Sequence, residues 1–64
     1  MLKGTVIGRK GSAAVVRVYY PAEGGARAWT VRVPASMPLP ALGMFVVFQE
    51  DAKGGPTLLQ VFKP

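Results

Sequence analysis

Basic and aromatic side chains are the main candidates for a functional site in this chain, because Cys and His are absent and acidic residues are few. The sequence contains no Cys and no His, which excludes thiol nucleophiles, imidazole bases and the common ligands of zinc and iron. Its acidic residues are Glu23, Glu50 and Asp51 alone, too few for a credible calcium loop and a poor basis for paired-carboxylate catalysis. We therefore expect no enzymatic activity, no cofactor and no metal site.

The positive charge is the first functional signal. Eight Lys and Arg residues stand against three Asp and Glu residues, which gives the 64-residue chain a formal charge of +5. Residues 1–32 hold six basic residues and one acidic residue, so they carry the entire excess, whereas residues 33–64 are neutral. An excess concentrated in one half of a small domain favours a polyanionic partner. The alternative is a set of surface charges that only keeps the protein soluble.

Short β-strands must position these side chains. Alternation and β-branched or aromatic residues predict five strands, at 2–8, 12–20, 27–33, 43–49 and 57–62. Glycines and Pro21 mark the turns between them. Residues 34–42 contain three prolines, which exclude a regular helix or a central strand and predict an extended connector with at most one 3₁₀ turn. The chain is therefore expected to be one all-β domain, residues 1–64, folded as a small five-stranded antiparallel barrel that leaves few exposed strand edges.

The order of these elements resembles an OB-fold. The chain has two hairpin-linked strands, then a third strand, an irregular link and two further strands. It is similar to small RNA-binding OB domains of the S1-like and initiation-factor-like type in two places, at Lys3-Gly4-Thr5-Val6 and at Gly43 before the apolar fourth strand. A proline-rich link stands where many OB-folds have a helix, and the aromatic RNA-binding motifs of cold-shock domains are absent. An SH3-like barrel is therefore the alternative.

The resemblance implies a ligand face on the outer surface of the second and third strands. Alternation places Arg17 and Tyr19 together on the outside of the second strand and Arg32 on the outside of the third, with Trp29 in the core. Cations neutralise phosphates and an aromatic ring stacks on a base. The predicted nucleic-acid-binding residues are Lys3, Arg9, Lys10, Arg17, Tyr19, Arg27, Arg32 and Lys53. In the alternative interpretation, the arginines pair with Glu23 or Glu50, Tyr19 is an ordinary cross-strand partner, and a one-residue slip turns Trp29 outward.

The fourth strand suggests a second surface. Residues 44–48 (MFVVF) are apolar on both faces, whereas a strand with one solvated face should alternate. A chain of this size has little material to cover a second apolar face. We therefore expect a homodimer or higher oligomer. Its predicted interface residues are Phe45, Val47, Leu58 and Phe62.

Two functions follow from these surfaces. The first is a non-enzymatic nucleic-acid-binding module, for single-stranded DNA or RNA rather than duplex. The alternative is a protein-interaction or assembly module that self-associates through the fourth and fifth strands. No apolar segment approaches the roughly 20 residues that cross a bilayer, and the start of the chain lacks the long apolar region of a signal peptide. We expect a cytoplasmic protein without a membrane partner.

Overall fold

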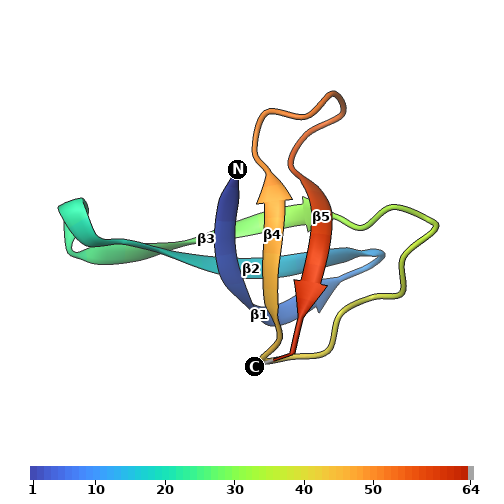
Figure 1. Ribbon diagram of the computed structural model, residues 1–64, viewed down its shortest axis with the longest axis horizontal. Helices are drawn as coiled ribbons and strands as arrows, with labels where there is room; N and C mark the ends of the chain where they lie inside the picture. The colour runs from blue at the N-terminus through green and yellow to red at the C-terminus, as the bar shows by residue number, and fades with distance from the viewer. Residues whose placement is uncertain (64) are drawn as a thin grey trace.

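Five β-strands and one turn of 3₁₀ helix make up the structure, a computed structural model that describes residues 1–63 (Figure 1). The all-β class predicted from the sequence is confirmed. Within the described chain no helix is long and apolar enough to cross a membrane. The elements are β1 (Leu2–Lys10), β2 (Ala13–Tyr20), η1 (Pro21–Glu23), β3 (Gly25–Arg32), β4 (Phe45–Gln49) and β5 (Thr57–Phe62).

The strands close into a barrel in the order β1-β2-β3-β5-β4, and β4 pairs back onto β1. Four of the pairings are antiparallel, but β3 and β5 run parallel and meet only at Arg32 and Thr57. The antiparallel barrel expected from the sequence thus contains one parallel pair. A closed ring with an odd number of strands cannot alternate direction all the way round, so one parallel junction is required. This closed barrel is consistent with an OB-like fold, and an SH3-like description is also compatible.

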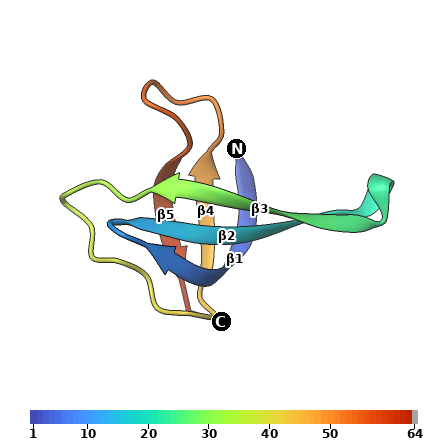
Figure 2. The same ribbon diagram turned by 180° about the vertical axis from the view of Figure 1, so that it is seen from behind.

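Strand β1 is bent, and its two parts pair with different strands. Its first part, Leu2 to Thr5, pairs with β4, and its second part, from Thr5 to Lys10, pairs with β2. Figure 2 shows the change of direction between the two parts. Gly4 lies at this corner, where an added Cβ would come within 2.5 Å of the backbone oxygen of Arg17. The bend of β1 against β2 therefore depends on a residue without a side chain.

The core consists of the inward-facing residues of all five strands. Alternation along β2 is confirmed, because Ala14, Val16 and Val18 are buried and Arg17 and Tyr19 are exposed. The fully enclosed members of the core are Val6, Ala14, Val16, Val18, Val31, Val46, Phe48 and Leu58. The half-buried Trp29 packs against this cluster, with its ring centroid 5.4 Å from that of Phe48. Trp29 thus lies on the core side of β3, as predicted.

A β-bulge in β1 changes the face of the residues that follow it. Simple alternation would place Gly8 on the same side as the buried Val6. The register instead shifts between these two residues, and Gly8 pairs with Val15 on the outer side of β2. A Cβ on Gly8 would lie 3.8 Å from the Cβ of Val15, as expected for residues that share a face. The bulge consequently brings Lys10 to the outer face of the barrel.

A second bulge, in β5, buries one residue that was predicted to lie at an oligomer interface. Phe48 pairs with Leu58 and the preceding Val47 pairs with Gln60, so Leu59 is an extra residue in β5. Leu58 consequently turns into the core and is 1% exposed. Its predicted place at an oligomer interface was wrong, because the bulge reverses the phase of the strand.

Candidate nucleic-acid interface

The β2–β3 hairpin extends beyond the barrel as an arm (Figures 1 and 2). On one face of this arm the indole N–H of Trp29 donates a hydrogen bond to the hydroxyl of Tyr20 at 3.0 Å. The guanidinium carbon of Arg27 lies 5.1 Å from the centroid of the Tyr20 ring, and one of its nitrogens contacts Glu23 Oε1 at 2.6 Å. Arg27 is therefore occupied by an ion pair and a cation–π contact.

The Tyr20 hydroxyl gives a simple test of this arm. Tyr20→Phe removes the acceptor of the Trp29 indole and is expected to lower the free energy of unfolding by about 1 kcal/mol, the usual value of such a hydrogen bond. Chemical denaturation followed by tryptophan fluorescence measures the change. Tyr19→Phe is the matched control. Because Tyr19 is 64% exposed, this substitution is expected to leave the free energy of unfolding unchanged. An equal loss in both variants would contradict the role of the hydrogen bond.

Cross-strand pairing collects four cations and one aromatic ring on the opposite, outer side of β1, β2 and β3. Lys10 pairs with Ala13, which in turn pairs with Arg32, and further along β2 Arg17 lies between Thr5 and Ala28. Residues that pair directly across strands point to the same side of a sheet. We call the resulting surface the basic face. Its members are Lys3, Lys10, Arg17, Tyr19 and Arg32.

All three acidic side chains of the sequence are engaged away from the basic face. Glu23 pairs with Arg27, and Asp51 accepts a hydrogen bond from Gln49 at 3.3 Å. Glu50 Oε1 lies 3.0 Å from the amino group of Met1. Its hydrogen bond to that amino group lowers the pKa of Glu50 below the ordinary value. Neither Glu23 nor Glu50 neutralises a cation of the basic face.

Arg32 is positioned by a neutral partner instead of an acid. Its guanidinium donates a hydrogen bond to Thr57 Oγ1 at 3.2 Å, and its backbone N–H donates to the Pro56 carbonyl at 2.8 Å. Within residues 1–63 no ion pair includes Arg17 or Arg32. The pairing of these arginines with Glu23 or Glu50, considered as an alternative from the sequence, does not occur in the described residues.

Three predicted site residues lie apart from the basic face. Arg9 pairs with Ala14, a core position, and so follows the opposite phase from Lys10. Arg27 pairs with the buried Val18 and lies on the other side of the arm from Arg17. Lys53 is carried by the β4–β5 loop, which leaves the barrel from the end of β4 opposite to Phe45. The structure thus brings together four of the seven predicted cations.

A hollow lies within the basic face where β1 turns away from β2. Its volume is about 240 Å³, and its lining includes Lys3, Thr5, Arg17, Tyr19 and Phe45. Thr5 pairs with both Arg17 and Phe45, which puts the aromatic ring of β4 in the same cross-strand row as a cation of β2. From the sequence, Phe45 was assigned to an oligomer interface. The pairing of β1 with β4 is non-local, so no pattern along the chain pointed to this proximity.

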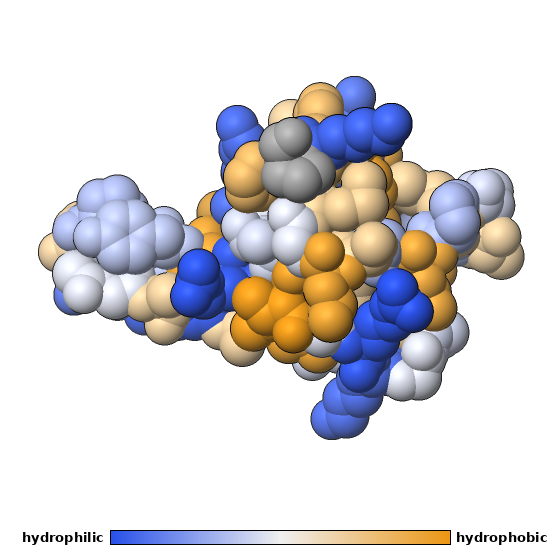
Figure 3. All heavy atoms as spheres, turned by 90° about the horizontal axis from the view of Figure 1, so that it is seen from below, coloured by the Kyte–Doolittle hydropathy of each residue, from blue (hydrophilic) through white to orange (hydrophobic). Residues whose placement is uncertain are grey.

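Apolar side chains cover part of the remaining surface. Phe45 and Phe62 are opposite one another on β4 and β5 and are 40% and 38% exposed, and the neighbouring Val47 is half-buried. Figure 3 shows apolar atoms in the middle of the lower face with hydrophilic side chains beside them. A separate hollow of about 470 Å³ lies between the proline-rich link, from Met37 to Met44, and β5. The Phe45–Phe62 pair and this hollow are therefore apolar parts of the surface.

Fold and surface together define a small five-stranded β-barrel with one basic, acid-free outer face. Among residues 1–63, no three acidic, Cys or His side chains come together in a way that could hold a metal ion. Comparisons with models of protein families, with curated proteins and with solved structures give no match to this chain.

Proposed function

We propose that this barrel is an OB-type domain that binds single-stranded nucleic acid without catalysing a reaction. The observation that carries the proposal is the basic face, where four cations and an exposed tyrosine share one side of the sheet with no carboxylate among them. Phosphates are attracted to such a surface, and an exposed ring offers a platform for a base. The surface supplies both components of single-strand binding.

A single strand suits this surface better than a duplex. Tyr19 is 64% exposed, and stacking on such a ring requires a base that is not already paired and stacked in a helix. The outer positions of β3 that pair with Tyr19 and Arg17 are Ala26 and Ala28, so no large side chain of β3 obstructs the ring. From Ala13 to Tyr19 the face extends roughly 20 Å at about 3.3 Å per residue. This length matches the smallest OB-fold sites, about four nucleotides.

The proposal is tested by titrating the protein with a short single-stranded oligonucleotide over a series of salt concentrations. Four phosphate contacts should give a slope of log K against log[salt] of roughly −3, since each contact on a single strand contributes about −0.7. Fluorescence anisotropy of a labelled oligonucleotide measures the affinity. Absence of binding at low salt, or a slope near zero, would contradict the proposal. A duplex of the same length should bind more weakly.

Self-association is the second candidate function, favoured by the exposed Phe45–Phe62 pair. An assembly module would associate through these apolar side chains, and the association would resist salt because little charge is involved. Sedimentation velocity at low and high salt separates the two functions. A salt-resistant dimer that binds no oligonucleotide would favour assembly, and a monomer at micromolar concentration would exclude the predicted oligomer.

A further inference from the structure

We propose that the hollow between β1, β2 and β4 holds one unstacked nucleobase, with the rings of Phe45 and Tyr19 against the base and Lys3 and Arg17 on the adjacent phosphates. This inference rests on the proposed function and specifies the part of the nucleic acid that enters the site. It extends the interface beyond the basic face to β4, where Phe45 lies.

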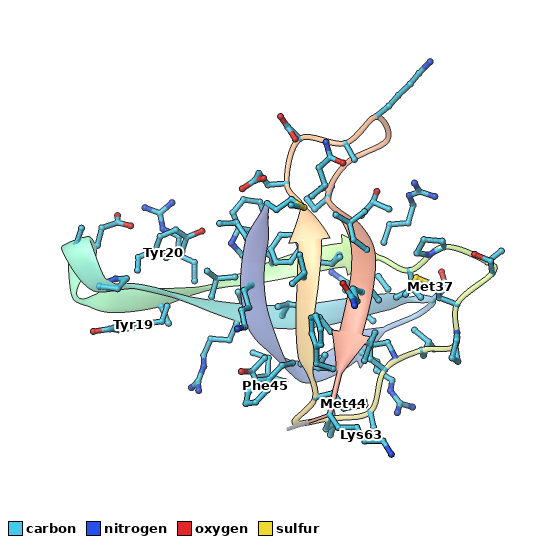
Figure 4. The ribbon with its side chains drawn as sticks, in the orientation of Figure 1. Tyr19, Tyr20, Met37, Met44, Phe45 and Lys63 are labelled. Carbon is cyan, nitrogen blue, oxygen red and sulfur yellow. The ribbon has the colours of Figure 1, made fainter. Side chains whose placement is uncertain are left out.

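The position of the hollow follows from the divergence of two strands. β1 and β2 are paired as far as Thr5 and Arg17, and then β1 leaves to pair with β4. Lys3, on the departing part of β1, and Tyr19, on β2, line the gap that opens between them. In Figure 4, Tyr19 and Phe45 lie on the lower side of the ribbon, whereas Tyr20 lies above the arm. Tyr19 and Phe45 therefore both contribute rings to the lining of this hollow.

The size of the hollow limits the ligand to a single ring system. Its volume of about 240 Å³ is below the roughly 300–1,000 Å³ of pockets that enclose drug-sized molecules. A single base, placed against one or two rings, makes better use of such a shallow site than a stack of several bases. The flanking nucleotides then continue over the basic face.

The chemistry of the lining favours a ligand that joins a neutral aromatic ring to a negatively charged group. Phe45 and Tyr19 supply ring surfaces, and two cations, Lys3 and Arg17, stand beside them without a carboxylate in the lining. A purely apolar ligand would leave both cations unused, and a phosphate alone would leave both rings unused. The Thr5 hydroxyl can donate or accept a hydrogen bond at the edge of a base. A nucleotide unit satisfies all of these groups.

The test compares Phe45→Leu with Phe62→Leu, which alters the similarly exposed partner of Phe45 across β4 and β5. The probes are a short oligothymidylate and an abasic oligonucleotide of equal length, which has the same phosphates and no bases. Phe45→Leu is expected to weaken oligothymidylate binding about tenfold, the order expected for loss of a stacked base. It should leave abasic binding and the salt slope unchanged. Phe62→Leu should change neither affinity, and circular dichroism verifies the fold of both variants.

The outcomes separate this proposal from the function on which it rests. If the unaltered protein binds oligothymidylate with the expected salt slope but the two variants bind it equally, the base site is wrong and the nucleic-acid function stands. If Phe45→Leu weakens both probes equally, Phe45 supports the fold or the charges and not a base. If the unaltered protein binds neither probe at low salt, both proposals fail. Tyr19→Leu provides a second variant, expected to behave like Phe45→Leu.

Discussion

Reversing two charges of the basic face, with Arg17→Glu and Arg32→Glu together, is expected to reduce single-strand binding about 100-fold or more at low salt. The change removes two phosphate contacts and adds two repulsive carboxylates beside the remaining cations, Lys3 and Lys10. The residual salt slope should fall from roughly −3 to about −1.4, since each lost contact removes about 0.7. Anisotropy titrations at several salt concentrations measure both quantities.

The matched control is the double variant Arg9→Glu and Lys53→Glu. It changes the net charge by the same amount, and both residues are exposed but lie outside the basic face. Binding should weaken far less, through the general field of the protein only. Equal losses in the two double variants would mean that net charge, and not the arrangement on β1–β3, determines binding. Thermal melts are needed alongside, because Arg32 also donates a hydrogen bond to Thr57.

Phe48→Ala is expected to have the largest effect on stability, a loss of about 3–5 kcal/mol. Phe48 is among the largest fully buried side chains and contacts the indole of Trp29. A domain of this size seldom has more than about 3–5 kcal/mol of stability in total, so the variant should be largely unfolded at room temperature. Urea denaturation followed by Trp29 fluorescence reports on this contact directly.

Phe45→Ala is the control for this second prediction, since it makes the same substitution on the same strand at a position that is 40% exposed. Its stability loss should be about 1 kcal/mol or less. A cooperative, near-native transition for Phe48→Ala would contradict the assignment of this residue to the centre of the core. The pair also separates fold from site, because only the Phe45 variant should keep its fold while losing contact with a base.

Local patterns in the sequence predicted much of the fold. Period-two alternation identified the inner face of β2, with Ala14, Val16 and Val18, because burial on one side of a strand selects every second residue. The same alternation placed Arg17 and Tyr19 outside and Trp29 toward the core. Prolines predicted the irregular segment between β3 and β4. These properties depend only on neighbours along the chain.

β-Bulges are the reason why the face of some strand residues could not be predicted from the sequence. The extra residue in β1 moved Lys10 onto the basic face and gave Arg9 the opposite phase, and the extra residue in β5 turned Leu58 into the core. Alternation assumes that each residue of one strand pairs with one residue of the next strand. A bulge adds an unpaired residue to one strand, and the local sequence does not reliably show where this happens. Face assignments therefore failed on one side of each bulge, at Gly8 after the bulge in β1 and at Leu58 before the bulge in β5.

Sequence patterns alone were enough to predict the all-β class, the five strands, the absence of thiol and imidazole chemistry, and the concentration of positive charge in residues 1–32. The folded barrel sets which charged side chains share one face. Arg27 is held in an ion pair with Glu23, whereas closure of the barrel groups Lys3 with Arg17 and places Phe45 at the hollow beside them. Closure of the barrel pairs β1 with β4 as well as with β2. Because β1 and β4 are far apart along the chain, their contacts leave no periodic trace in the sequence.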